Sequence, residues 1–352
     1  MTAREEIVNE DAERAVMRLD ASPLRGARVL LAGANGLLGS SFAHFFNHLN
    51  RSQGFGISCD CVTKNELSPE SRIYDLREAS GFRIIQANLA TDTPYDGAYD
   101  FVIYAAGYSA PLRFLRDPLE VVEVNYDGMK RLLRHVREKS QRAKVLYFSS
   151  SEIYGSPPPE SIPTPETYPG NSPVTNPRAC YVESKRLTEV MCLIYRSQGI
   201  DVKIVRPALT YGPGLGLQDE RVLSQFVRKA HLDKKIDMLD DGRDLRAYCY
   251  GEDMLVELLL ILLKGKEVIY NAGSDREEVS IKDLALTIGS IMGVPVNVGA
   301  PRQGAVGAPG RVLLDISKVR NEFGFAPKVT LEEGLRRTIQ WATSNSENQN
   351  NE

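Results

Sequence analysis

An apolar run that ends in a glycine-rich turn constrains this chain more than any other feature. Residues 27–33 read ARVLLAG, and Gly33, Gly36 and Gly39 follow one another at intervals of three before a helical pattern begins. Glycines so placed let backbone amides approach a phosphate at a helix N-terminus, where the helix dipole favours negative charge. The succession of strand, turn and helix predicts a dinucleotide-binding site.

Strand-like and helical patterns alternate through the first 207 residues. Five more near-continuous apolar runs occupy 55–62, 82–88, 100–107, 144–150 and 201–207, with helical patterns between most of them. Such runs are typical of parallel strands that are covered by helices on both faces. The sequence therefore predicts an α/β fold with a Rossmann-type, doubly wound parallel sheet.

The regularity changes after residue 207. Pro and Gly cluster in 206–216, and the helical stretches that follow are accompanied by short strands such as 267–273 (EVIYNAG). This pattern indicates a smaller mixed α/β lobe. Helical stretches are expected near 220–233, 253–264, 280–292 and 330–343. We divide the chain into a polar N-terminal leader (1–25), a Rossmann domain (26–207), a substrate-binding lobe with segments that return to the sheet (208–343) and a frayed tail (344–352).

Composition argues against several classes of function. The 43 Lys and Arg residues are balanced by 46 Asp and Glu, whereas nucleic-acid binders usually carry a basic surplus. The five Cys and four His lack CxxC or HExxH spacing, so no metal site is expected. The longest apolar run, near 255–263, is too short to span a bilayer, and the charged N-terminus does not resemble a signal peptide. We expect a cytoplasmic protein without a nucleic-acid or membrane partner.

Tyr181 and Lys185 lie four residues apart in a helical pattern, on one face of the expected helix. A Tyr with a pKa of about 10 is a poor base at neutral pH. A neighbouring ammonium group, helped by a positively charged nicotinamide ring, can lower this pKa enough for the Tyr to take a proton from an alcohol. Ser150, at the end of the run 144–150, can hydrogen-bond the reacting oxygen. These three residues are the predicted catalytic group.

Together these features resemble the extended short-chain dehydrogenase/reductase family, also known as the NAD-dependent epimerase/dehydratase family, over about residues 27–343. Within it, the local sequence is most similar to UDP-glucuronate decarboxylases (UDP-xylose synthases). The similar segments are SSEIYG (150–155), PRACY (177–181), DERVLSQF (219–226) and RAY (246–248).

The resemblance implies a nucleotide-diphosphate sugar as substrate, NAD as cofactor and a homodimer. It assigns the cofactor to Gly33, Asn35, Gly36, Leu37, Leu38, Gly39, Thr63, Lys64, Asn65, Asn88, Leu89, Ala105, Ala106, Gly107, Asn125, Tyr181 and Lys185. It assigns the substrate to Tyr108, Ser151, Arg178, Arg221, Arg246, Tyr248 and Arg311. Guanidinium groups match phosphate geometry, whereas Tyr108 and Tyr248 suit a sugar pocket or core packing equally well.

Glu152 distinguishes between the reactions of this family. A shared first step oxidises the C4 hydroxyl of the sugar, which labilises a carboxylate on C5. Dehydratases of the family carry an Asp-Glu pair where this chain has Ser151 and Glu152, and 4-epimerases usually carry an apolar residue at 152. A lone acid, assigned as the fourth catalytic residue, fits decarboxylation, because carbon dioxide leaves without acid help and one acid then reprotonates C5. The alternative for Glu152 is a strand-end cap or a salt bridge.

We therefore predict a decarboxylase for a UDP-glucuronate-type substrate. The alternatives are a 4,6-dehydratase, a 4-epimerase, an NADPH-dependent 4-ketoreductase and a non-catalytic dinucleotide-binding module.

The sequence also departs from the family pattern. Thr63 stands where an acidic residue binds the adenosine ribose of NAD, and Lys64 after it suits either the 2′-phosphate of NADP or solvent. Other departures are Asn88 for Asp, Ser184 for Gly and Leu209 for Asn. The sugar, the nucleobase and the choice between NAD and NADP therefore stay open.

Apolar residues in the helices expected at 118–139 and 178–198 suit either a dimer interface or the side that faces the sheet. They are Val121, Val124, Leu187, Val190 and Ile194.

Overall fold

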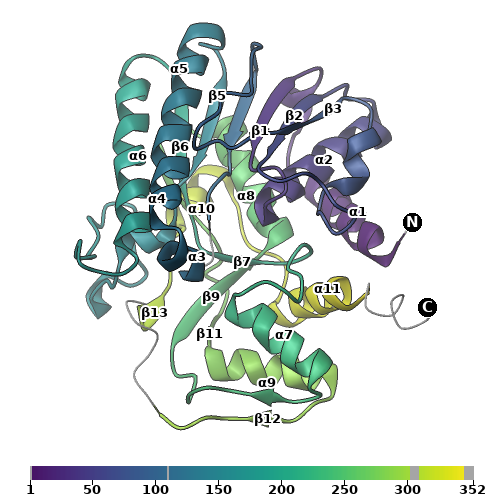
Figure 1. Cartoon of the computed structure of the whole chain (residues 1–352), viewed down its shortest axis with the longest axis vertical. Helices are drawn as coiled ribbons and strands as arrows, with labels where there is room; N and C mark the ends of the chain where they lie inside the picture. The colour runs from purple at the N-terminus through teal and green to yellow at the C-terminus, as the bar shows by residue number, and fades with distance from the viewer. Residues whose placement is uncertain (1, 109–110, 302–308, 345–352) are drawn as a thin grey trace.

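A sheet of seven parallel strands forms the larger lobe (Figure 1). The computed structural model describes residues 2–108, 111–301 and 309–344. From one edge to the other, the strands are β10 (Ile269–Ala272), β6 (Asp201–Pro207), β5 (Lys144–Phe148), β4 (Phe101–Tyr104), β1 (Arg28–Ala32), β2 (Ser58–Thr63) and β3 (Phe82–Gln86). The chain order reverses between β1 and β4, and doubly wound sheets bind their ligands at such a point.

Helices cover both faces of this sheet. They are α1 (Ala3–Val16), α2 (Leu37–Gln53), α3 (Pro111–Arg116), α4 (Pro118–Val122), the π-helix η3 (Glu123–Gly128), α5 (Met129–Lys139), α6 (Ala179–Ser197), α8 (Gly251–Lys264) and α10 (Ser317–Phe323). Val29 and Leu31 of β1 share a core with α2 and α8, whereas Leu30 and Ala32 share one with α5 and α6. Successive side chains of a strand point to opposite faces, so the predicted doubly wound sheet is confirmed.

The smaller lobe lies at the carboxyl ends of the strands (Figure 1). Its central strand β9 (Leu245–Tyr250) pairs with β7 (Leu209–Tyr211), β11 (Glu278–Ser280) and β13 (Arg311–Val312). A second pair of strands is β8 (Ile236–Asp237) and β12 (Val296–Asn297). Helices α7 (Val222–Leu232), α9 (Ile281–Met292) and α11 (Leu331–Thr343) match three of the helical stretches expected from the sequence.

One strand lies in a different sheet from the one expected. The segment 267–273, predicted as a strand of the smaller lobe, forms β10 at the edge of the main sheet, where Ile269 pairs with Ile204 of β6. Tyr270 and Ala272 of β10 are buried in the core that contains α8. Helix α8 thus leads the chain back beneath the main sheet, which local sequence pattern cannot reveal.

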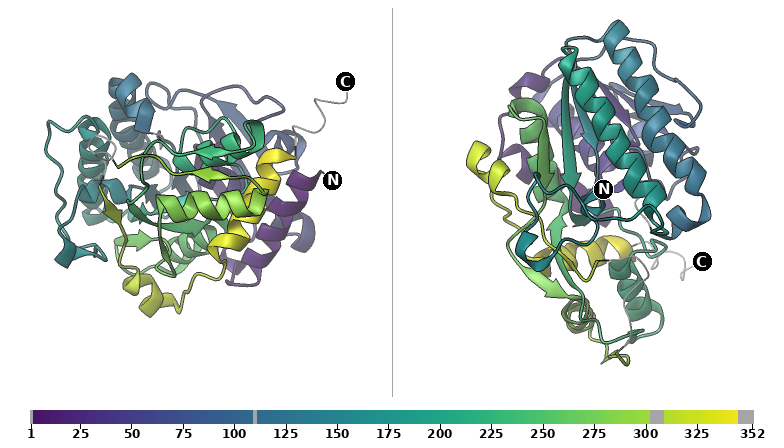
Figure 2. Two further views of the ribbon diagram at one scale, coloured as in Figure 1. Left: turned by 90° about the horizontal axis from the view of Figure 1, so that it is seen from below. Right: turned by 90° about the vertical axis from the view of Figure 1, so that its left-hand side faces the viewer.

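The segment expected as a polar leader contains a packed helix, α1. Thr2 and Glu5 form a capping box at its start, and Ala15 is fully buried in the core with α2 and α8. After the helix ends, Arg18 forms ion pairs of 2.9 Å with Glu252 and 2.6 Å with Asp253. Helix α1 also lies beside α11, close to the other end of the chain (Figure 2).

The structure shows which of the five apolar helix residues face the core and which face the outside. Val121 and Val124 are buried, with 1% and 7% of their surface exposed. Leu187, Val190 and Ile194 of α6 are each at least 50% exposed. The first two therefore belong to the core, and the other three form a stripe on the outer surface of α6.

Glu257 of α8 leads to a prediction about stability. It is fully buried, its Oε2 accepts a hydrogen bond of 2.8 Å from the Gly273 amide, and its Oε1 has no partner among the described residues. Burial raises the pKa of Glu257 well above its usual value. An acid with a raised folded-state pKa stabilises the fold fully below its unfolded pKa, and this stability declines as pH rises towards the folded value.

The Glu257→Gln variant keeps the shape and the acceptor but cannot ionise. We expect its denaturant midpoint to exceed that of the wild type by an amount that grows from about pH 5 to about pH 8. Glu78→Gln, at a side chain that is 85% exposed, is the matched control and should show no such trend. A pH-independent difference for the Glu257 variant would contradict this account.

Candidate active site

The predicted catalytic residues meet at the carboxyl end of β5. Ser150 follows this strand and caps the short 3-10 helix η4 (Ser151–Tyr154), and Tyr181 and Lys185 lie on the first turns of α6. The Ser150 hydroxyl acts to lower the pKa of Tyr181. The Lys185 ammonium donates a 2.7 Å hydrogen bond to the Phe148 carbonyl and lies 5.8 Å from the centre of the Tyr181 ring. The expected cluster is thus present.

Burial sets the protonation of both groups. It raises the pKa of Tyr181 above its ordinary value, and it lowers the pKa of Lys185 to about 7. Both shifts favour the neutral forms, so the pair alone does not make Tyr181 a base at neutral pH. A positive charge from a bound ligand is needed to lower the pKa of Tyr181.

Asn125 carries an unsatisfied acceptor beside this pair. It lies in η3, and its Nδ2 donates to Ser184 Oγ at 2.9 Å, while its Oδ1 is buried with no partner among the described residues. A Cβ added to Gly107 would lie 3.0 Å from Asn125 Oδ1 and 3.5 Å from Lys185 Nζ. Ser184, where the family has Gly, therefore serves to orient Asn125. The orphaned oxygen needs a donor that a water molecule or a ligand can supply.

Phe114 of α3 covers the catalytic Tyr, which the sequence did not suggest. Its ring stacks on that of Tyr181 with centroids 4.2 Å apart and planes 8° apart. Cys180 also contacts this segment, because its Sγ lies 3.5 Å from the Phe114 carbonyl. Phe114 thus fixes the tilt of the ring and closes one of its faces.

The glycine turn follows β1 at the point where the strand order reverses. Gly33 has a φ of +83°, and a Cβ there would lie 2.7 Å from the backbone of Ala106. A Cβ at Gly39 would collide with the carbonyl oxygen of Gly33. Gly36 begins α2, whose first residues include Leu37 and Leu38, and no side chain caps this helix N-terminus. The open amides and the close backbone packing suit a pyrophosphate group.

Arg72 is half-buried beside this turn and was missed by sequence reasoning. Its side chain donates to the carbonyls of Asn35 at 2.9 Å and Gly214 at 2.6 Å, and its own amide donates to Asn35 Oδ1 at 2.8 Å. Burial lowers the pKa of Arg72. The side-chain oxygen of Asn35 therefore holds the loop that carries Arg72. That loop is irregular, so no periodicity could have revealed the contact.

The ends of β2 and β3 carry the other residues expected at the cofactor. Thr63 is buried and donates to the carbonyl of Asn65 at 3.0 Å. Asn88 uses its Oδ1 to accept from the Ala90 amide at 3.1 Å, so this side chain caps a turn. Lys64 bonds to the hydroxyl of Tyr108 at 2.8 Å. Leu89 is buried, and Ala105 and Ala106 border Gly33.

Glu152 forms an ion pair with Arg178, at 2.9 Å and 3.0 Å from one guanidinium nitrogen. The salt bridge foreseen as an alternative role for Glu152 is therefore present. The negative charge of Glu152 also acts to raise the pKa of Tyr181.

A cavity of about 840 Å³ extends from Glu152 into the smaller lobe. Its lining includes most of the residues predicted to bind substrate: Ser151, Arg178, Arg221, Arg246, Tyr248 and Arg311. Tyr248 has a buried hydroxyl with no partner among the described residues, and burial raises its pKa to about 12. Tyr108 contacts Lys64 and is absent from this lining.

The arginines of the cavity all have acidic partners. The pairs are Arg178–Glu152, Arg221–Asp219 at 2.7 Å, Arg246–Asp244 at 3.3 Å and Arg311–Glu278 at 2.7 Å. Sequence reasoning found the arginines and Glu152 but not the other three carboxylates. Two of those pairs join residues two positions apart, and Arg311–Glu278 joins β13 to β11 across β9, so they become visible only once the turns and the strand register are known.

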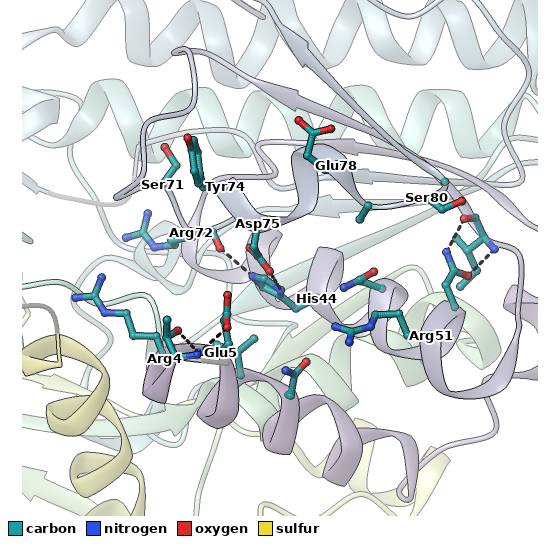
Figure 3. Close-up of a pocket in the computed structure, with 18 of the residues that line it drawn as sticks. Arg4, Glu5, His44, Arg51, Ser71, Arg72, Tyr74, Asp75, Glu78 and Ser80 are labelled. Carbon is teal, nitrogen blue, oxygen red and sulfur yellow. Dashed lines mark hydrogen bonds and ion pairs between the residues drawn. The ribbon is translucent and has the colours of Figure 1, made fainter.

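A second cavity, of about 1040 Å³, lies between α1, α2 and the 3-10 helix η2 (Tyr74–Glu78). Arg4, His44, Arg72 and Asp75 border it (Figure 3). None of the four predicted catalytic residues lines it. Of these four residues, Glu152 lines the smaller cavity, together with most of the residues predicted to bind substrate, and we therefore assign the chemistry there.

Two classes of site are not found in the described part of the chain. His, Cys, Asp and Glu residues there form no cluster of three or more that could hold a metal ion. Nor is any described helix both long and apolar enough to cross a lipid bilayer.

The sequence from residue 29 to residue 273 matches the NAD dependent epimerase/dehydratase family. The chain belongs to this family. The predicted family is thus confirmed, and NAD, the predicted cofactor, is the one for which the family is named.

Curated relatives of this chain are named either as decarboxylases or as a reductase. UDP-glucuronic acid decarboxylase 1 of Xenopus tropicalis is 31% identical over 253 residues, which are 72% of this chain and 59% of that protein. The match therefore spans less than two thirds of that relative. UDP-glucuronic acid decarboxylase 3 of Arabidopsis thaliana is 28% identical, covering 89% of this chain and 90% of that one. The dTDP-4-dehydro-6-deoxy-D-allose reductase of Streptomyces bikiniensis is 28% identical, covering 90% and 96%.

Solved structures of other sugar-modifying enzymes share the fold. A dTDP-glucose 4,6-dehydratase from Streptomyces venezuelae, with NAD bound, has a TM-score of 0.75 and 23% identity, covering 91% of this chain and 98% of that one. A UDP-glucuronic acid 4-epimerase from Bacillus cereus, in complex with UDP-glucuronic acid and NAD, has a TM-score of 0.71 and 20% identity, covering 90% and 99%. Similarity at these identities establishes the architecture only.

The glycine packing predicts the effect of adding one methyl group. Gly39→Ala places a Cβ against the Gly33 carbonyl, so we expect NAD to bind at least about tenfold more weakly, as measured by calorimetry. Gly216→Ala is the matched control, because no atom lies within 4 Å of its added Cβ. Circular dichroism checks that both variants fold. Equal NAD affinity in the two folded variants would contradict the role of this turn.

Proposed function

We propose that this chain is an NAD-dependent decarboxylase of a nucleotide sugar of the UDP-glucuronate type. The observation that carries the proposal is the lone acid Glu152, which is ion-paired with Arg178 in the lining of the cavity and whose charge acts on Tyr181. Ser151 occupies the place of the second acid of a dehydratase. The 31% identity to a UDP-glucuronic acid decarboxylase supports the same reaction. We assign the cofactor to residues 26–207 and the sugar nucleotide to residues 208–343.

The residues present fit the cofactor. The open N-terminus of α2 suits the pyrophosphate. Asn125 Oδ1, which has no partner among the described residues, and the adjacent Lys185 can hydrogen-bond other groups of the cofactor. NAD, when bound, supplies a hydride acceptor for C4 and a positive ring charge. That charge offsets the effect of burial on the pKa of Tyr181.

Tyr181 then takes the proton of the C4 hydroxyl, while Ser150 hydrogen-bonds the same oxygen. Lys185 is anchored on the Phe148 carbonyl and stabilises the tyrosinate that lies beside it. The C4 ketone attracts the electron pair of the bond between C5 and its carboxylate. That bond breaks, carbon dioxide leaves, and the pair becomes an enolate across C4 and C5.

Glu152 completes the reaction: once its carboxylate has taken a proton from solvent, it delivers that proton to C5, either directly or through a water molecule that it orders. Arg178 orients the carboxylate for this step through its two contacts. Tyr181 returns its proton to the oxygen, and a bound NAD would give the hydride back to C4, so no cofactor would be consumed. The arginines of the cavity bind the diphosphate.

The test supplies UDP-glucuronate and NAD and measures carbon dioxide and a UDP-pentose. We expect Tyr181→Phe to lower the turnover by about 10²–10⁴-fold, the usual contribution of general acid–base catalysis. Glu152→Gln should still oxidise C4 but release less product. Turnover of a neutral hexose nucleotide, without turnover of any uronic acid nucleotide, would overturn the proposal.

A second candidate is a 4-ketoreductase on the same scaffold. The Streptomyces relative and the absence of an acid at Thr63 favour it. It predicts steady consumption of a reduced cofactor with a 4-ketosugar, whereas decarboxylation is redox-neutral. A single progress curve at 340 nm, the absorbance of reduced nicotinamide, separates the two.

We also propose that two copies associate through α6. Leu187, Val190 and Ile194 form an exposed apolar stripe at intervals of three and four, as a helix-packing face requires. We expect the wild type to be a dimer by light scattering, and Val190→Glu with Ile194→Glu to be a folded monomer. Met17→Glu, at an exposed apolar residue distant in sequence, is the control. A wild-type monomer would exclude this interface.

A further inference from the structure

Lys64 bridges the ends of two strands that flank the glycine turn. It follows Thr63, the last residue of β2, and its ammonium donates to the Tyr108 hydroxyl at 2.8 Å. The same ammonium forms an ion pair with Glu120 of α4. Tyr108 follows β4, and β1 lies between β4 and β2 in the sheet. The bridge therefore spans the strand ends on either side of the glycine turn.

An acidic residue usually stands at the end of β2 in NAD sites, where it accepts hydrogen bonds from the adenosine ribose. Thr63 occupies that place here and its hydroxyl is bonded to the Asn65 carbonyl. The Glu120 carboxylate of α4 contacts the ammonium of Lys64, the residue that follows Thr63. Its side chain is 23% exposed and that of Lys64 is 43% exposed, so both are open to a ligand.

We propose that Glu120, brought to the end of β2 by Lys64, is the residue that makes this site select NAD over NADP. This inference rests on the proposed dinucleotide binding. The carboxylate accepts hydrogen bonds from the ribose hydroxyls of NAD. It repels the 2′-phosphate of NADP, which carries a charge of about −1.5 to −2 if it titrates like other phosphate monoesters.

Lys64 does not act as a phosphate ligand in this arrangement. Its charge is matched by Glu120, and its hydrogen bond to Tyr108 fixes the direction of its side chain. A 2′-phosphate could use Lys64 only by displacing the carboxylate, against the repulsion between the two anions.

The test measures dissociation constants for NAD and NADP by calorimetry, on protein freed of retained nucleotide. We expect the wild type to bind NADP at least about tenfold more weakly than NAD. Glu120→Gln frees Lys64 and should shift the ratio of the two constants towards NADP by about tenfold or more. Adding Lys64→Gln to that variant should abolish the gain. The matched control is Glu123→Gln, an exposed acid three residues further along.

The outcomes are distinct. A ratio that Glu120→Gln does not change, or a wild type that prefers NADP, overturns the assignment of Glu120. A shift of equal size in Glu123→Gln also overturns it, because the effect would then be general surface charge. Failure of the wild type to bind either nucleotide would instead refute the proposed dinucleotide site.

Discussion

The close approach of Gly33 to Ala106 is the contact on which the site depends. It joins β1 to the end of β4 at the place where the strand order reverses, and any Cβ on Gly33 would lie 2.7 Å from that backbone. Helix α2 begins four residues later, at Leu37, so its open N-terminus faces the same point. On the other side of the contact, Gly107 brings the chain next to Asn125 and Lys185. One backbone contact thus links the cofactor cradle to the catalytic pair.

The position of α6 is secured separately, by a buried ion pair. Glu189 lies one turn beyond Lys185 and bonds to Arg206 of β6 at 2.6 Å and 2.9 Å. Arg206 also donates to the hydroxyl of Tyr154 in η4, the segment that carries Glu152. Removing one partner of such a pair leaves a buried charge unmatched, at a cost of about 3–5 kcal/mol. The network therefore fixes the helix that holds Tyr181 relative to the segment that holds Glu152.

Local patterns were sufficient for most of the fold and for the catalytic group. Apolar runs marked the six strands up to β6, and the i, i+4 spacing placed Tyr181 and Lys185 on one helix face. The sequence indicated that segments after residue 207 return to the main sheet, but not that β10 is one of them, because its partner β6 is more than sixty residues away and its pattern also suits the smaller lobe. The position of β10 at the edge of the main sheet can be deduced only once α8 is known to pass beneath that sheet.

Within the site, the contacts that escaped prediction are made by segments without periodicity. Phe114 reaches Tyr181 from a short helix after β4, and Arg72 reaches Asn35 from the loop after β2. Phe114 is hydrophobic, which also suits any core position, and Arg72 is charged, which also suits a position on the surface. Their role depends on where the chain turns, and that is decided by packing between lobes rather than by local sequence.

Under the proposed function, binding of a diphosphate in the cavity would exchange partners that already exist. Each of the four arginines contacts a carboxylate, and partly exposed pairs of this kind contribute only about 0–1 kcal/mol. The carboxylates keep the guanidinium groups oriented and the local charge balanced, at little cost to a ligand that displaces them. Arg178 differs from the other three, because its partner is Glu152. An anionic group that draws Arg178 away changes the surroundings of the acid as the substrate arrives, whereas the other exchanges leave the reacting atoms untouched.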